Sequence, residues 1–203
     1  VVAAAGNDKH KVDIPGGDDY DNYWTSSVYG TRYYHRGTTP GHGDVITVGA
    51  MDFGNGSTSG WNPPTNNIRS SFSNAGPGVD LYAPGSWIMG AIPEGCTIWD
   101  QYNNDYRGNY VLDSNYKAIA ISGTSMACPQ VTGVIAQLAE ARRKWNHYQF
   151  KDYIVQLAWD NHMKGTGQTD DYTSSSTIFG GPNKLLKAPF ISTKKLTMSN
   201  GDS

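Results

Sequence analysis

Apolar residues along this chain occur in short runs that long polar stretches separate. Runs rich in β-branched and small side chains, bounded by Gly, Asn or Pro, predict buried strands. Such runs lie at residues 1–5, 45–50, 79–85, 86–92 and 118–122. A small hairpin is expected within residues 24–34.

Two segments carry apolar residues at helical spacing. The first begins at Ser125 and is expected to end at Arg143 or Lys144, because basic side chains suit the C-terminal end of a helix. The second lies within residues 148–161. Buried strands followed by helices predict an α/β domain with a largely parallel sheet. The apolar positions of the two helices are Met126, Ala127, Val131, Val134, Ile135, Leu138 and Ala139, then Phe150, Tyr153, Ile154, Leu157 and Ala158.

The polar stretches predict long loops. Residues 8–43, 52–67 and 93–116 are rich in Gly, Asn, Asp and Tyr and lack a helical period. A structureless loop of such length in a compact domain is typically functional or disordered. Residues 192–203 read as a loose polar tail, which leaves residues 1–191 for one domain.

Composition removes several classes of function. The net charge of the 203 residues is −2, so nothing points to nucleic acid or to an acidic partner. No apolar run approaches the length of a membrane-spanning helix. Cys96 and Cys128 could form one disulfide, but two cysteines do not make a framework, and we expect both to be free thiols.

The stretch ISGTSMACPQVTG, residues 121–133, is the chemically distinctive one. A predicted strand ends at Gly123, and Ser125 falls in the first turn of the following helix. The free N–H groups and the positive end of the helix dipole face that turn, so an oxyanion formed by attack of the serine would meet donors. The alternative interpretation is that a serine before an apolar helix is simply an N-cap.

Four blocks in one order bear on this choice: VVAAAGN at the start, VITVGA at 45–50, SSFSNAGPGVDLYAPG at 70–85 and GTSMACP at 123–129. As a set they resemble the subtilisin-like serine proteases, the subtilases. The resemblance implies a subtilisin-like α/β fold, with a mostly parallel sheet flanked by helices in three layers. It also implies that the chain is the C-terminal part of a catalytic domain that is incomplete at its N-terminus.

The resemblance also implies roles for single residues. Ser125 matches the nucleophile, and Asn7 matches the asparagine whose side-chain amide donates to the oxyanion, with the Ser125 N–H as second donor. Thr124 flanks the serine and is expected to fix the asparagine side chain. The residues expected to line the substrate cleft are Ala4, Gly6 and Gly123.

The resemblance places the catalytic Asp and His of the family before Asn7, and therefore upstream of this chain. None of the histidines present stands in a subtilase histidine motif, so we expect the chain alone to be inactive. Gln130 stands where the family usually has a further, non-catalytic histidine, which we interpret as a packing change. The five histidines are His10, His35, His42, His147 and His162.

No cofactor is required for this chemistry, but the resemblance implies a structural calcium ion. Its ligands would be the carbonyl oxygens of Gly43 and Val45 and the carboxylate of Asp80. The alternative is that Asp80 is a surface aspartate at the start of a strand. The acidic residues 16–22 are a weaker candidate, and their spacing is more typical of a solvated loop.

Two functions of different class remain. The first is a serine endopeptidase acting on polypeptides, whose partner is the upstream part of the same domain and whose secretion the resemblance favours. The second is a catalytically inactive subtilase fold that serves as a binding or structural module, for which Tyr- and Asn-rich loops are suitable surfaces. An unrelated serine hydrolase is disfavoured because no Gly-x-Ser-x-Gly motif is present.

Overall fold

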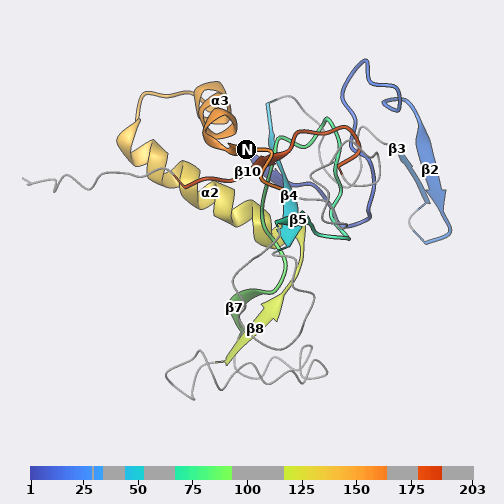
Figure 1. Cartoon of the computed structure of the whole chain (residues 1–203), viewed down its shortest axis with the longest axis horizontal. Coiled ribbons are helices and arrows are strands. Elements are labelled where there is room, and N and C mark those ends of the chain that lie inside the picture. The colour runs from blue at the N-terminus through green and yellow to red at the C-terminus, as the bar shows by residue number, and fades with distance from the viewer. Residues whose placement is uncertain (29, 34–43, 53–66, 93–116, 164–177, 189–203) are drawn as a thin grey trace, which may run out of the picture.

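A mostly parallel sheet forms the centre of the computed structural model, which describes residues 1–28, 30–33, 44–52, 67–92, 117–163 and 178–188 (Figure 1). The strand order is β1-β4-β6-β10-β9, and β5 pairs with the end of β4. Strands β1, β4, β6 and β10 run parallel, whereas β9 and β5 pair antiparallel to their neighbours. The strands are β1 (Val2–Ala4), β4 (Ile46–Asp52), β5 (Ile68–Arg69), β6 (Leu81–Pro84), β9 (Trp159–Asp160) and β10 (Lys184–Leu185).

The register brings distant segments to one edge of the sheet. Val2 pairs with Ile46, and Val48 pairs with Leu81. Parallel strands end at the same edge, so the segments that follow β1 and β6 lie near one another. In parallel α/β sheets this carboxyl edge is where sites are usually built.

Helices α2 and α3 follow β8 (Lys117–Ile121) in the chain, and strands β9 and β10 come after them. Helix α2 spans Thr124–Ala141, somewhat shorter than the pattern predicted, because Arg142 N–H closes the last turn on the Leu138 carbonyl oxygen. Helix α3 spans His147–Leu157 and begins with a capping box. The Asn146 side chain accepts from Gln149 N–H at 3.0 Å, and the Gln149 side chain accepts from Asn146 N–H at 2.9 Å.

The helices pack on one face of the sheet, where alternate residues of each strand point. The buried residues of the cluster between them are all apolar, and α3 contributes Ile154, with Val155 packed against the cluster. Its buried members are Ile46, Val48, Ala50, Leu81, Ala83, Ala127, Val131 and Ile154. Within the described residues both helices lie on this face, which is one helical layer rather than the two that a three-layer arrangement would have.

Loop segments cover the opposite face. Tyr82 points into this second cluster, and its ring lies directly over Gly49 of the neighbouring strand. A Cβ atom at Gly49 would lie 2.4 Å from the Tyr82 ring, so the position accepts only glycine. The remaining buried members are Ala5, Val12, Met51, Ala75, Val79, Met163, Ile178 and Leu185.

Two hairpins project from this body (Figure 1). One joins β2 (Tyr23–Ser26) to β3 (Gly30–Tyr33), which confirms the predicted hairpin. The other joins β7 (Ile88–Ile92) to β8 (Lys117–Ile121) and precedes α2. Predictions for residues 53–66, 93–116 and 192–203 fall outside the described residues.

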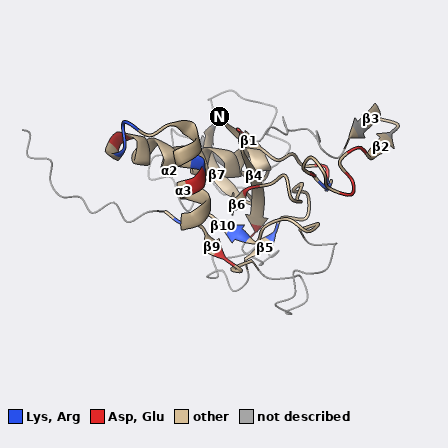
Figure 2. Cartoon of the chain, turned by 90° about the horizontal axis from the view of Figure 1, so that it is seen from above, with Lys and Arg blue, Asp and Glu red and all other residues tan. Residues whose placement is uncertain are grey.

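Charged side chains of both signs are dispersed over the described elements (Figure 2). Lys11 lies beside the acidic residues 16–22. Its Nζ is 2.7 Å from Asp19 Oδ2 and 3.1 Å from Asp13 Oδ2. The hydrogen bond from Lys11 lowers the pKa of Asp19. The loop is thus partly neutralised by its own lysine. Within the described ranges, no helix has the length and apolarity needed to span a bilayer.

Candidate active site

Ser125 is the second residue of α2 and is exposed. The N-cap position belongs to Gly123, whose backbone is extended and which makes no side-chain capping bond. The interpretation of Ser125 as an N-cap is therefore wrong. Its hydroxyl stands at the positive end of an 18-residue helix, at the carboxyl edge of the sheet.

Thr124, buried beside the serine, holds the side chain of Asn7. Both the Thr124 backbone N–H and the Thr124 hydroxyl donate to Asn7 Oδ1, each at 2.9 Å. A backbone N–H can only donate, so the amide oxygen must be the atom that faces Thr124, and the amide NH₂ must face the other way. The Thr124 hydroxyl in turn accepts from Gly6 N–H at 3.1 Å.

The freed NH₂ group of Asn7 and the backbone N–H of Ser125 border the same space. A Cβ atom built on Gly123 would lie 3.6 Å from Asn7 Nδ2 and 3.7 Å from Ser125 N. Gly123 itself is anchored because its N–H donates to the Gly85 carbonyl at 2.8 Å. The amide NH₂ of Asn7 and the backbone N–H of Ser125 therefore both lie near Gly123, at the N-terminal end of α2.

Asn74 supports this arrangement from below and was not singled out by the sequence patterns. Its Oδ1 accepts from Asp8 N–H at 3.0 Å and from His10 N–H at 2.8 Å, and its Nδ2 donates to the Ala5 carbonyl at 2.8 Å. Asn74 is fully buried, so these bonds fix the turn that presents Asn7. The signal available in the sequence was a polar residue between the small residues of SSFSNAGPG.

Gly6 gives that turn its shape. Its φ of 99° lies in the region that favours glycine, and its carbonyl accepts from Asn74 N–H at 2.8 Å. A side chain here would be strained, because residues with a Cβ atom rarely adopt a φ in this range.

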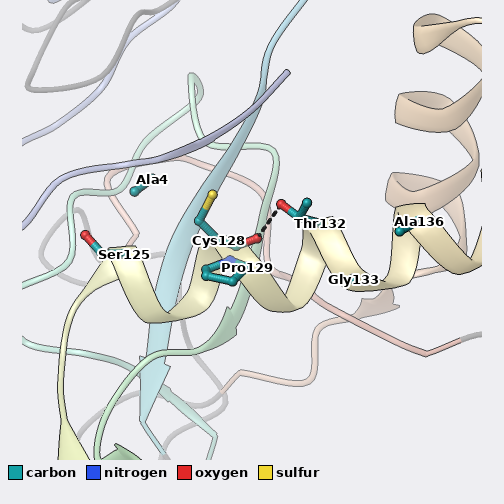
Figure 3. A pocket seen from close by; sticks show the side chains of 7 residues that line it. All are labelled: Ala4, Ser125, Cys128, Pro129, Thr132, Gly133 and Ala136. Carbon is teal, nitrogen blue, oxygen red and sulfur yellow. Dashed lines mark hydrogen bonds between the residues drawn. The ribbon is translucent and has the colours of Figure 1, made fainter. Parts of the chain in front are cut away.

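A cleft of about 600 Å³ runs along α2 from Ser125 (Figure 3). Small side chains keep it open, and the Thr132 hydroxyl donates to the Cys128 carbonyl at 3.0 Å along its floor. Cys128 is a free thiol whose pKa is raised by burial. Of the predicted cleft residues, Ala4 lines it, whereas Gly6 and Gly123 flank the serine end. The lining residues are Ala4, Ser125, Cys128, Pro129, Thr132, Gly133 and Ala136.

Within the described part of the chain, no hydrogen bond joins Ser125 to a histidine. The ring of His147 lies against Tyr148 and that of His162 against Trp159, both in tilted arrangements with ring centroids 3.9 and 5.2 Å apart. His35 and His42 lie outside the described residues.

Gln130, at the position where a histidine was expected from the resemblance, joins α2 to the end of β6. Its Nε2 donates to the Pro84 carbonyl and, at 3.3 Å, to the Met126 carbonyl. These contacts are those of a packing residue.

Two residues predicted to bind calcium contact a lysine instead. Lys151 Nζ lies 2.9 Å from Asp80 Oδ1 and 2.8 Å from the Val45 carbonyl oxygen. The third predicted ligand, Gly43, lies outside the described residues. With an ammonium group already on both oxygens, the residues that the structure describes here do not fit a metal ion. Among those residues, no group of three His, Cys, Asp or Glu side chains is close enough to hold one.

An exposed serine at a helix N-terminus, beside an oriented asparagine amide at the carboxyl edge of a parallel sheet, is an arrangement typical of serine hydrolases. A sequence model described as "Subtilase family" matches residues 1–181. The chain belongs to this family of subtilisin-like serine proteases.

Similar proteins support the assignment. The chain is 30% identical over 133 residues to "M-protease" of Shouchella clausii, and 32% identical over 112 residues to "Subtilisin-like protease SBT4.13" of Arabidopsis thaliana. These matches cover 66% and 51% of the chain but only 25% and 14% of the two relatives.

Solved structures are also similar. The fervidolysin structure from Fervidobacterium pennivorans, titled a keratinolytic enzyme related to subtilisin, has a TM-score of 0.54 at 25% identity. It covers 92% of this chain, which corresponds to 21% of that protein. The structure of a cold-adapted subtilisin-like serine proteinase has a TM-score of 0.51 at 26% identity. The match covers 92% of this chain and 44% of the proteinase chain. The predicted α/β subtilisin-like fold is confirmed.

Proposed function

We propose that the protein is a serine endopeptidase in which Ser125 attacks the carbonyl carbon of a peptide bond. The Asn7 amide and the Ser125 N–H then donate to the oxyanion of the tetrahedral intermediate. The observation that carries this proposal is the saturation of Asn7 Oδ1 by two donors of Thr124, because it leaves the amide NH₂ for the substrate. In subtilisin, a member of the same family, loss of one such donor lowers kcat by about 10²–10³.

The attacking hydroxyl needs a base, which we propose is a histidine oriented by an aspartate, both supplied from upstream of this chain. The absence of a histidine on Ser125 among the described residues is consistent with this division. A serine hydroxyl without a base stays protonated near neutral pH and attacks slowly. The isolated chain is accordingly expected to be inactive, and the family resemblance supports secretion of the protein.

Labelling by a fluorophosphonate probe tests the nucleophile. Ser125→Ala should abolish labelling of the active protein and leave its fold intact, because the substitution opens no cavity and removes no capping bond. Thr132→Ala is the matched control, since it removes a hydroxyl from the same cleft and the same helix. Asn7→Ala should retain labelling but turn over a fluorogenic peptide more slowly.

The results also decide between the two functions. Equal labelling of wild type and Ser125→Ala would place the nucleophile elsewhere. No labelling of the wild-type protein, with the upstream part of the domain present, would favour the inactive binding module.

A further inference from the structure

Lys151 projects from α3 onto the amino ends of two parallel strands. Its ammonium group lies 2.9 Å from Asp80 Oδ1, just before β6, and 2.8 Å from the Val45 carbonyl oxygen, just before β4. The side chain of Lys151 is 20% exposed and that of Asp80 is 22% exposed. This edge of the sheet is opposite to the one that carries Ser125, because the strands run parallel.

Asp80 is held in place by groups other than the lysine. Its Oδ2 accepts from Thr47 N–H at 2.8 Å, and its own N–H donates to the Thr47 carbonyl at 2.9 Å. One carboxylate oxygen is thus fixed to the backbone of β4, and the other is aimed at a point that it shares with the Val45 carbonyl. Converging carboxylate and carbonyl oxygens are the donors that hard cations select.

We propose that Lys151 is the resident cation of this oxygen site and that its ammonium group stands where a metal ion would otherwise bind. Charge favours the lysine: one carboxylate balances one positive charge, whereas a divalent ion would leave an excess and would face the ammonium as well. Coordination favours it too, because a lysine needs at most three acceptors, whereas calcium takes six to eight oxygens and would need waters beside the two protein oxygens here.

Lys151 also links helix α3 to the sheet, because its side chain belongs to the helix and its ammonium group contacts the strand ends. A metal ion at this position could link them only if α3 supplied further ligands. Ile154 of α3 is fully buried in the core three residues after Lys151 and so on the same face of the helix. The ion pair and this apolar anchor together fix α3 at the ends of β4 and β6.

Thermal unfolding of the purified protein with EDTA or with calcium chloride tests the proposal. Lys151→Met keeps an apolar stem and removes the charge, and its midpoint should fall by about 3–8 °C whether or not calcium is present. Lys151→Ala also vacates the space of the side chain. Its midpoint should fall with EDTA and recover by at least half with calcium at about 10⁻³–10⁻² M, roughly tenfold above the Kd of about 10⁻⁴–10⁻³ M of weak calcium sites.

Lys184→Ala is the matched control. Lys184 is 24% exposed and pairs with Asp160, but that aspartate is 65% exposed, so the pair contributes little. We expect calcium to reduce the difference in unfolding midpoint between wild type and Lys151→Ala. The difference in midpoint between wild type and Lys184→Ala should stay the same with and without calcium.

Differences between variants cancel any calcium effect that arises elsewhere in the protein. The proposal is overturned if Lys151→Ala and Lys151→Met are as stable as wild type, or if calcium leaves the difference in midpoint between wild type and Lys151→Ala unchanged. It is also overturned if calcium stabilises the wild-type protein and Asp80→Asn removes that stabilisation. Should Lys151→Ala not fold in EDTA, recovery of the folded protein on refolding in calcium supports the proposal, and failure in both media opposes it.

Discussion

Replacement of Thr124 by valine separates the hydroxyl of this buried residue from its shape. The threonine hydroxyl accepts from Gly6 N–H and donates to Asn7 Oδ1, and valine is nearly isosteric but does neither. The Thr124 backbone N–H still donates to Asn7 Oδ1, so the amide keeps one of its two bonds. Thr124→Val should therefore loosen the asparagine without removing it.

The magnitudes follow from the bonds lost. A partly buried Gly6 N–H without an acceptor costs about 1–3 kcal/mol of stability, which is a fall of about 2–10 °C in Tm for a domain of this size. One lost hydrogen bond to Asn7, worth about 0.5–1.5 kcal/mol, should lower kcat about 2- to 10-fold. KM should change little, because the amide acts on the transition state.

The assay is kcat and KM on a fluorogenic peptide together with Tm, for Thr124→Val and for Thr124→Ser. The variants are made in the protein that includes the upstream part of the domain, because the isolated chain is expected to be inactive. Serine restores the hydroxyl and should recover most of kcat, although it leaves a small void. If Thr124→Val lowers Tm but leaves kcat at the wild-type value, the orientation of Asn7 is not catalytic. If Thr124→Ser is as slow as Thr124→Val, the methyl group matters and the hydroxyl does not.

Two further predictions concern the scaffold. Burial alone raises the pKa of Asp13, but hydrogen bonds from Ile14 N–H, Asp19 N–H and Lys11 outweigh it and hold the pKa below its ordinary value. The Asp13 carboxylate therefore stabilises the folded state above an unfolded pKa of about 3.9, and this stabilisation is lost as the pH falls below that value. In urea unfolding, Asp13→Asn should be about 1–3 kcal/mol less stable than wild type at pH 7, and the difference should be smaller at pH 3. An equal difference in stability at both pH values would refute the role of the charge. Gly49→Ala should lower stability by about 1–3 kcal/mol or more through its clash with the Tyr82 ring, whereas Gly133→Ala, whose new methyl group meets nothing within 4 Å, should raise it by up to about 1 kcal/mol.

Strands were predictable where burial on both faces produces a continuous run of apolar and small residues, and helices where burial imposes a helical period. The run at 45–50 predicted β4, whose residues 46–51 are all buried, with Ile46, Val48 and Ala50 in the cluster beneath the helices. Strands β5, β9 and β10 were not predicted, because each has two residues and shows no period. Expecting helices on both faces was reasonable for a parallel sheet, but here loops cover the second face in the described residues.

The family motifs led to the expectation that Thr124 fixes the Asn7 side chain, and two hydrogen bonds join these residues across 117 positions of sequence. The motifs did not indicate which atoms of the two residues make the bonds, and that required coordinates. Lys151 was invisible to the patterns for a simpler reason. A lysine on a helix looks the same in sequence whether it faces water or, as here, a carbonyl 106 positions away.

Because the cation at this site is a side chain of the protein, the solution conditions that can break the contact between α3 and the sheet differ from those that would release a metal ion. A bound metal is in exchange with the medium, so dilution, phosphate or a chelator empties its site by mass action. The Lys151 ammonium is tethered by its own side chain and its local concentration is fixed by the fold. The contact is therefore insensitive to chelators but sensitive to chemical modification of the lysine amine. Carbamylation, acetylation or reaction with an aldehyde would remove the positive charge and leave Asp80 opposite a neutral group.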